Sequence, residues 1–480
     1  MKKKFITNLV LVIFLNLLIK PFYILGIDAE VINQVGAKAY GNYFALINFS
    51  FILNIILDLG ITNFNVKNIA QHHQLLDKHF SGIITIRLIL VIIYCIATLL
   101  LAILVGYNSL QIKLLIILAI NQSLVAFILY IRSNLSGLHL FFQDSLISIL
   151  DRTLLILICS LLLWGGITSQ PFQIEWFVYS QTLAYFITLI VCFLLVFSKT
   201  NKFTFKWNTK FALVILKQSF PYALLILLMT IYYRIDSVML ERMLNDQSLQ
   251  AGIYAQAYRF FEASNMIAYL FAALLLPIFS RMIKLNQSIV EIVNFSFKLL
   301  MGFVLTLAVF CCIFNYNIID FRYDAHIEEA SKILSVLMIC FLFVSSTYIF
   351  GTLLTANGNL YHLNLVAGIG VVINITLNIL LIPKYQALGS AFASLITQFL
   401  TGVAQIILCC HFFNLNLKKT LSQILIFLIG LFLFAFFLKC FYSFTILNLL
   451  LYLTFSFIWL FISKLVKISD FHLLISTEIK

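Results

Sequence analysis

Long apolar runs separated by short polar breaks repeat along the whole chain. A helix needs about 20 apolar residues to cross a bilayer, and about fourteen runs reach that length. Helices satisfy their own backbone hydrogen bonds in lipid, which fits a chain with only 5 prolines. The pattern therefore predicts an all-α polytopic membrane protein. The predicted spans cover residues 5–27, 40–60, 83–105, 112–131, 146–165, 174–197, 219–240, 252–279, 293–314, 331–355, 360–382, 386–412, 420–438 and 442–463.

The composition supports lipid as the solvent of this chain. Of the 480 residues, 62% are apolar and 10% are charged, whereas soluble domains are roughly 45–50% apolar and about 25% charged. A soluble globular fold and a disordered chain are therefore excluded. The 9 cysteines lie inside apolar stretches without Cys-x-x-Cys spacing, so we expect them to act as small apolar side chains.

The first apolar run begins like a secretory signal peptide, because Lys2, Lys3 and Lys4 precede it. No small-x-small cleavage site follows, and the run continues past Lys20 to Ile27. That length is sufficient to span a membrane. We therefore predict that this segment is the first transmembrane helix.

The net charge of +13 is explained by lysines and arginines that concentrate in alternate loops. If the N-terminus is cytoplasmic, most of the 31 lysines and arginines fall in every second loop or at the helix ends beside it, as the positive-inside rule requires. The alternation predicts about fourteen helices with both termini in the cytoplasm. Because the basic charge is explained by topology, we expect no nucleic-acid partner.

Motifs for enzymatic chemistry are absent from the sequence. It contains no P-loop, no Gly-rich dinucleotide turn, no nucleophile elbow and no His-Glu-x-x-His stretch. We therefore expect neither ATP hydrolysis nor another enzymatic activity, and no resident metal or cofactor.

Lysines concentrate between the sixth and seventh predicted spans, in residues 199–217. Two interpretations stay open: an inner loop that obeys the positive-inside rule, or a surface that contacts lipid head groups or couples two halves of the protein. We take this segment as the boundary between two six-helix bundles, 1–200 and 201–412, which are followed by a helix pair at 413–480.

A short repeated pattern supports the division into halves. Gly41-Asn42-Tyr43 opens the second predicted span, and Gly252-Ile253-Tyr254 opens the eighth. Because each bundle contains an even number of spans, the repeat is predicted to be parallel, with an axis along the membrane normal.

Five of the cations inside predicted spans are candidates for a site, since a cation in a span costs about 2.5–3.5 kcal/mol on the insertion scale. At about 1.5 Å rise per residue, Lys20, Arg234 and Arg259 lie roughly 10 Å below the outer surface. Arg87 and Arg152 lie close to the inner surface. Such side chains either snorkel to the interface or face a water-filled cavity. We predict a cationic cavity that binds an anionic head group on its way between the leaflets.

Carboxylates inside the spans are harder to accommodate, because short acidic side chains snorkel poorly. Asp236 and Glu262 are therefore candidates for coupling to a cation such as H⁺ or Na⁺. Arg259 and Glu262 are three residues apart, which is the spacing of a pair on one helix face.

Polar residues also recur at helical spacing within several spans. Each set lies on one face of its helix, where amides, hydroxyls and tyrosine rings suit the hydroxyl groups of sugars. The alternative is interhelical hydrogen bonding, worth roughly 0.6 kcal/mol per contact. The predicted polar lining comprises Asn54, Asp58, Asp236, Tyr254, Tyr258, Glu262, Asn374 and Gln398.

Three blocks of the sequence resemble the polysaccharide biosynthesis flippases of the oligosaccharide-lipid exporter superfamily, which is related to the MATE transporters. The first block is VGAKAYGNYFAL (35–46) with DLGITNFNVKNIA (58–70). The second is SFPYALLILLMTIYYRIDSVML (219–240) with AGIYAQAYRFFE (251–262), which contain the Arg-Ile-Asp and Gly-x-Tyr-x-x-Ala-Tyr-Arg patterns. The third is NITLNILLIPKYQALGSAFASLITQ (374–398).

The resemblance implies a Wzx-type flippase for O-antigen or a related repeat unit. Such a protein moves an undecaprenyl-pyrophosphate-linked oligosaccharide from the cytoplasmic to the periplasmic leaflet of a bacterial inner membrane. It works by alternating access between two bundles in a V-shaped, MATE-like, pseudo-twofold arrangement. The lipid-linked glycan and the bilayer are the implied partners, with a polysaccharide polymerase and a chain-length regulator beside them. Arg234 and Arg259 match motif positions, whereas Lys20, Arg87 and Arg152 rest on the depth argument alone.

Two other functions compete with this prediction. A multidrug cation antiporter of the same superfamily would favour carboxylates over cations inside its bundles and would usually need only twelve helices. A polytopic polysaccharide polymerase or acyltransferase usually presents a long outer catalytic loop, whereas the longest outer connections here have roughly fifteen residues, within ordinary loop lengths. A non-enzymatic flippase is therefore the leading prediction.

Overall fold

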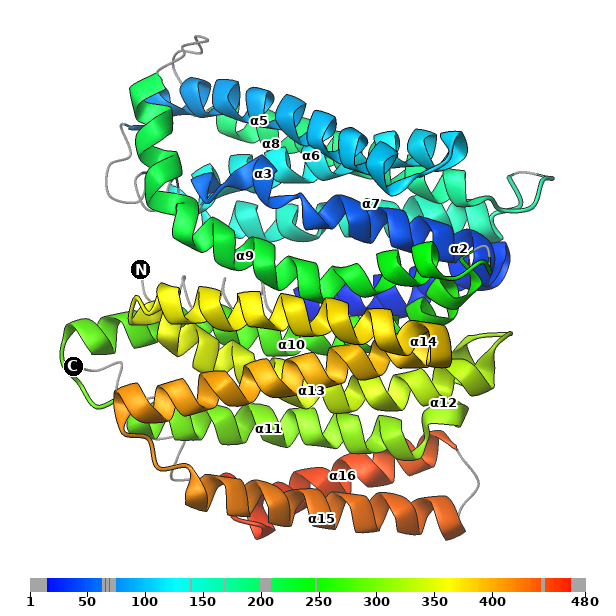
Figure 1. Cartoon of the computed structure of the whole chain (residues 1–480), viewed down its shortest axis with the longest axis vertical. Helices are drawn as coiled ribbons and strands as arrows, with labels where there is room; N and C mark the ends of the chain where they lie inside the picture. Colours follow the sequence, from blue (N-terminus) through cyan, green and yellow to red (C-terminus); the bar gives the residue numbers. More distant parts are fainter. Residues whose placement is uncertain are drawn as a thin grey trace. The chain divides into compact units, whose positions relative to one another are not determined.

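The computed structural model describes residues 15–62, 65, 69, 75–138, 140–167, 169–198, 209–246, 248–441 and 445–467 (Figure 1). Every regular element in these ranges is a helix. Lys2, Lys3 and Lys4, and most of the lysine-rich segment 199–217, lie outside the described residues, so the predictions about them remain as stated.

The chain forms two compact units, Met1–Gly252 and Ile253–Lys480. The first unit contains η1 (Tyr23–Asp28), α2 (Ala29–Ile52), α3 (Ile55–Asp58), α5 (Leu75–Val105), α6 (Ser109–Gly137), α7 (Phe141–Trp164), α8 (Ile174–Phe197) and α9 (Thr209–Met243). The second contains most of α10 (Leu249–Lys284) and all of α11 (Val290–Ile313), α12 (Asn315–Arg322), α13 (Ile327–Ala356), α14 (Leu360–Phe413), α15 (Lys418–Phe441) and α16 (Ile446–Ile462). The first unit thus includes α9, whereas the predicted bundles divide at residue 200. The predicted symmetry of the bundles stays a prediction.

Ten helices in the described part of the chain are long and apolar enough to cross a membrane. One of them, α14, has 54 residues and reverses its course at Gln386 (φ 52°), close to Pro383, so it provides two spans. A second reversal lies at Gly36 (φ 79°) inside α2, where glycine has no Cβ to oppose a positive φ. The apolar α16 adds a helix of 17 residues. Every predicted span therefore has a helical counterpart, and the prediction of an all-α polytopic fold with about fourteen helices is confirmed.

The first span is not a uniform α-helix. Residues 15–22 are helical and lead into η1, a six-residue π-helix. A π-helix accommodates an extra residue within a turn and frequently lies at a functional site. At its end, the buried carboxylate of Asp28 accepts a hydrogen bond from the Tyr40 hydroxyl at 2.7 Å. This bond ties the first span to the second.

In the first unit, α6 is the central helix and packs against α2, α5, α7 and α8. Its start is fixed by a capping box, in which Asn108 and Gln111 each accept a hydrogen bond from the other's backbone N–H. Apolar side chains such as Phe80, Ile131 and Cys192 join α5, α6 and α8 in one core cluster. On another side of the unit, α9 packs along α2.

The two glycines of the repeated Gly-x-Tyr pattern lie against each other in the first unit. A Cβ atom at Gly41 would overlap the carbonyl oxygen of Ser248, and one at Gly252 would overlap the carbonyl oxygen of Ala37. Backbone therefore packs directly on backbone where α2 meets the first turn of α10. Only glycine allows helices to approach this closely.

In the second unit, α13 packs against both α14 and α11. The last two helices, α15 and α16, pack against each other and against α11 (Figure 1). Their contact is a core of large apolar side chains that includes Phe310, Phe427 and Tyr452. These helices therefore belong to the apolar core of the second unit.

Candidate functional site

Lys20, Arg132 and Arg152 form a cation cluster in the first unit. The guanidinium carbon of Arg152 lies 4.8 Å from the ring centre of Tyr23 and 5.8 Å from that of Tyr185. Arg152 also donates a hydrogen bond to the Tyr185 hydroxyl at 3.2 Å. Two aromatic rings thus orient the guanidinium through cation–π contacts without neutralising its charge.

Both arginines of the cation cluster have a carboxylate partner. Nε of Arg132 donates to one oxygen of Asp144 at 2.7 Å, and the Ser136 hydroxyl donates to the other at 2.8 Å. Nε of Arg152 lies 3.6 Å from a carboxylate oxygen of Asp151.

Lys20 reaches the cation cluster from the first span. One turn before it, the Asn16 amide donates to the Ser148 hydroxyl at 3.1 Å, which fixes this face of the span against α7. The Lys20 ammonium lies within electrostatic reach of both arginines and of Asp151. Among the residues that the structure describes, however, it has no hydrogen-bond or ion-pair partner.

Lys20 and Arg152 lie close together in the structure, although their positions in the predicted spans put them at different depths. The reason is that α7 begins at Phe141 instead of residue 146, so Arg152 is the twelfth of its 24 residues and lies halfway along the helix. Arg132 was missed as a site residue because it was assigned to a loop, where positive charge is ordinary. In the structure, α6 extends past it to Gly137.

The cation cluster has an excess of positive charge, since three cationic side chains face two carboxylates. An ammonium inside a membrane span costs about 2.5–3.5 kcal/mol unless a partner compensates it. A phosphate group would supply that partner through charge-assisted hydrogen bonds, which arginine can make in pairs. The arrangement is therefore suited to an anionic ligand.

Arg87 lies in a different environment, with only 2% of its surface exposed. It pairs with Asp58 and donates to the Thr62 hydroxyl at 2.7 Å, to the Ala126 carbonyl at 2.9 Å and to the Leu57 carbonyl at 3.3 Å. These contacts hold the irregular end of the second span against α5 and α6. The geometry favours a structural role for both members of the pair, and their predicted roles at a substrate cavity stay predictions.

The remaining predicted residues of the first unit lie on α9 and near α3. Arg234 donates to the Asn48 side-chain oxygen at 3.0 Å and so links α9 to α2. Asp236, two residues further along α9, is buried. The Asn54 amide donates to the Gln122 side-chain oxygen at 3.2 Å and so links the second span to α6.

The sequence did not reveal a polar network at the C-terminal end of α9. The Gln111 side-chain nitrogen donates to Glu241 at 2.7 Å and to Asn42 at 2.9 Å. Arg242 pairs with Glu241 and stacks on the Tyr107 ring at 4.3 Å. Side chains on α2, α6 and α9 thus join in one cluster, which attaches α9 to the first unit.

In the second unit, the predicted pairing of Arg259 with Glu262 is confirmed by an ion pair along α10. On the same helix, the buried rings of Tyr254 and Tyr258 stack with their centres 5.8 Å apart. Members of the polar stripe of α10 thus contact one another along the helix, and their predicted roles at a substrate cavity stay predictions.

The predicted polar residues of α14 are buried beside its reversal. The Asn378 amide donates to the Asn374 backbone carbonyl at 3.0 Å, and the Ser390 hydroxyl donates to the Asn378 side-chain oxygen at 2.7 Å across the reversal. Gln398 is buried further along the second arm. Of these contacts, the one from Ser390 to Asn378 is an interhelical hydrogen bond of the kind that was the alternative to a sugar lining, and the predicted lining roles of Asn374 and Gln398 stay predictions.

The family of the chain follows from comparison with known proteins. A family model described as polysaccharide biosynthesis protein matches residues 30–283, more than half of the chain. The chain belongs to the polysaccharide biosynthesis protein family. The chain is also similar in sequence to an uncharacterized membrane protein of Methanocaldococcus jannaschii. The two are 26% identical over 400 residues, which cover 78% of this chain and 91% of that protein.

Solved structures share the fold of this family member. The lipid II flippase MurJ in an inward closed conformation matches with a TM-score of 0.73 at 19% identity, over 96% of this chain and 98% of that one. An inward-facing multidrug resistance MATE transporter of the MOP superfamily matches with a TM-score of 0.62 at 14% identity, over 81% and 94%. A MOP superfamily transporter from Pyrococcus furiosus gives 0.56 at 13% identity, over 85% and 93%. The family member therefore has a MATE-like fold.

Proposed function

We propose that this protein is a flippase that carries an undecaprenyl-pyrophosphate-linked oligosaccharide from the cytoplasmic leaflet to the opposite leaflet by alternating access. Family membership and the MATE-like fold support this function. The observation that carries it is the cation cluster, in which Lys20 has no hydrogen-bond or ion-pair partner among the described residues and three cations share two carboxylates. A pyrophosphate is the group that such a cluster would stabilise.

The chemistry of the substrate determines which part of it the protein binds and which part stays in the bilayer. The pyrophosphate is the part that bilayer hydrocarbon excludes most strongly, because a charge at the membrane centre needs a partner. Lys20 and Arg152 would contact it, and Asp144 and Asp151 would orient the two arginines. The prenyl chain can stay in the bilayer throughout, since it is as apolar as the lipid tails around it.

Carboxylates in the spans extend the proposal to the driving force. Asp236 and Glu262 would couple transport to an H⁺ or Na⁺ gradient, because an acidic side chain in a span is retained only with a partner or a function. The proposed setting is an inner membrane with both termini cytoplasmic, where a polymerase and a chain-length regulator would use the exported units. In this scheme the protein is not an enzyme.

The proposal is tested by the fate of lipid-linked oligosaccharide in cells that lack the gene. A flippase predicts that single repeat units accumulate on the cytoplasmic face of the membrane while surface polysaccharide disappears. The measurement is whether a membrane-impermeant glycosidase reaches the accumulated units in intact spheroplasts. Exported single units that never become polymer would instead identify a polymerase, and normal polymer would dismiss both functions.

A further inference from the structure

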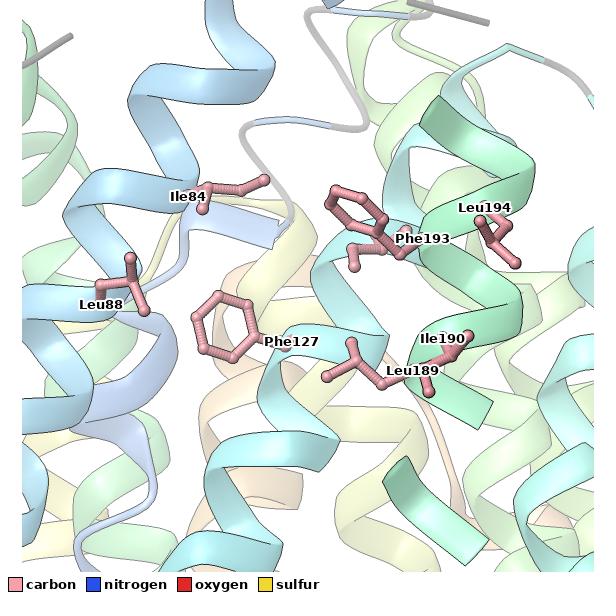
Figure 2. A pocket seen from close by; sticks show the side chains of 8 residues that line it. Ile84, Leu88, Phe127, Leu189, Ile190, Phe193 and Leu194 are labelled. Carbon is pink, nitrogen blue, oxygen red and sulfur yellow. The ribbon is translucent and has the colours of Figure 1, made fainter. Parts of the chain in front are cut away.

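A groove of about 380 Å³ lies between α5, α6 and α8 in the first unit. Figure 2 shows Ile84 and Leu88 of α5 on one side, the side chains of α8 between Leu189 and Leu194 on the other, and Phe127 of α6 between them. Every side chain that lines the groove is apolar. Water has nothing to bind there, because a hydrated site needs polar partners.

The groove opens on the surface that faces the bilayer. Leu88, Ile190 and Leu194 on its rims are 43%, 44% and 61% exposed, whereas Ile84 and Ile131 at its base are buried. The exposed apolar faces of α5 and α8 continue from both rims, so the groove is an indentation in the lipid-contacting surface. Its occupant must therefore come from the hydrocarbon of the membrane.

The groove also marks a place where helix packing is incomplete. Both α5 and α8 pack along α6, and the groove is the gap between them. An unfilled gap leaves its lining side chains without dispersion contacts on one side. Hydrocarbon that fills the gap would restore these contacts and join α5 to α8.

We infer that the groove binds one acyl chain of a bilayer phospholipid. A cavity of about 150 Å³ accommodates a benzene ring, so the volume found here suits a chain segment of about fifteen carbon atoms. Branched aliphatic and phenylalanine side chains on three helices surround such a segment by shape alone, and no head group is needed for recognition. The bound chain acts as a packing element of the first unit.

The site has a structural consequence for α5. Leu88, on the rim, directly follows Arg87, whose ion pair holds the second span. A filled groove supports α5 from the lipid side, while Arg87 fixes it from the inside. We therefore expect the occupied groove to stabilise the first unit as a whole.

The test uses the full-length protein in vesicles of phosphatidylethanolamine and phosphatidylglycerol that contain a phospholipid with a diazirine in mid-chain. After photolysis, mass spectrometry maps the labelled residues. We expect labels to concentrate on Phe127 and its neighbours in the groove. The double variant Leu88→Phe and Ile190→Phe fills the groove, so labelling of Phe127 should fall about fivefold because the chain is excluded.

A matched control separates the groove from ordinary lipid contact. Ile96→Phe and Leu183→Phe add the same two rings to exposed positions of α5 and α8 outside the groove, and labelling of Phe127 should not change. If the groove-filling double variant does not fold, Leu194→Phe at the most exposed rim position serves in its place. Equal labelling of Phe127 in filled and control variants would overturn the inference.

Thermal stability gives a second measurement. Adding phospholipid to lipid-stripped protein should raise the Tm of the wild type by several degrees, because a ligand stabilises the state that it binds. The groove-filling variant should gain clearly less, and an equal gain would count against the site. If trace undecaprenyl phosphate displaces the label from the groove, the occupant is a prenyl chain and the proposal is wrong.

Discussion

Lys20 and Arg87 show how differently two cations inside membrane spans can be used in one unit. The guanidinium of Arg87 is surrounded by a carboxylate, a hydroxyl and two backbone carbonyls. The ammonium of Lys20 instead lies among like charges, with Asp151 as the acidic group in reach. The first arrangement has a carboxylate that compensates its charge without a ligand, whereas the second gains stability when an anion binds. Burial alone, which is all that a hydropathy pattern reveals, does not distinguish them.

The role of Lys20 predicts a loss of transport without a loss of protein. Lys20→Gln removes the charge but breaks no hydrogen bond or ion pair within the described residues, so the protein should insert and fold normally. Transport of lipid-linked oligosaccharide into proteoliposomes should fall about tenfold or more, because a charge-assisted contact to the pyrophosphate is lost. Lys20→Arg should keep most of the activity. Lys332→Gln, at an exposed ion pair, is the control. Full transport by Lys20→Gln would remove this residue from the site.

The role of Arg87 predicts a loss of stability. Arg87→Ala leaves Asp58 without its partner, and because the Asp58 side chain is 32% exposed, the cost should lie below the ~3–5 kcal/mol of a fully buried pair. The double variant Arg87→Ala and Asp58→Ala should be clearly more stable than Arg87→Ala alone, because no uncompensated charge remains. Unfolding of the purified protein in detergent measures both variants. If Arg87→Ala keeps wild-type stability but abolishes transport, Arg87 contacts the substrate instead.

At the scale of elements, apolar runs located the helices well but not their ends. Hydropathy identifies a span because lipid penalises any polar interruption. It says little about where a helix ends in a polar region, and α6 and α7 both extend into the predicted loop between them. The pair of Arg132 with Asp144 lies across that short connection, so it could not be anticipated. The reversals at Gly36 and Gln386, in contrast, fall in or directly beside the predicted connections 28–39 and 383–385, so the pattern of apolar runs located both.

The contact between α2 and the first turn of α10 predicts strong sensitivity to one methyl group. Gly252→Ala would place a Cβ atom into the Ala37 carbonyl oxygen, so the two backbones must separate and lose their packing. We expect a marked drop in Tm and in the yield of folded protein. Gly368→Ala is the matched control, since nothing lies near its Cβ position. That change should be neutral or stabilising by about 0.5–1 kcal/mol. Equal effects of the two substitutions would contradict the close contact.

At the scale of the whole molecule, sequence reasoning identified the class and the family but only part of the site. Composition determines that the chain lies in lipid, and local motifs led to the family that the family model confirms. The cation cluster combines side chains from the first span, α6 and α7. The depth of a residue along its own helix does not show which helices lie next to each other, so the sequence did not predict this cluster. Fold likeness does not select among functions, because flippases and drug transporters share this architecture.

Reconstituted protein separates those two functions. A cation cluster with excess positive charge should repel organic cations and attract phosphate. Proteoliposomes should therefore translocate an undecaprenyl-pyrophosphate-linked sugar but should not accelerate proton-driven uptake of a lipophilic dye cation. The control is the Lys20→Gln protein at the same density. Rapid dye transport with no movement of the lipid-linked sugar would assign the protein to the drug transporters.

The π-helix η1 sets the rotational phase of the first span. A residue added to an α-helix turns everything before it by about 100° relative to everything after it, and η1 absorbs such a residue between Lys20 and α2. Removing one residue from η1 would leave the span equally hydrophobic and equally able to insert into the membrane. It would also swing Asn16 and Lys20 away from α7. The direction in which the Lys20 ammonium points thus depends on an irregular helical turn that a hydropathy plot does not detect.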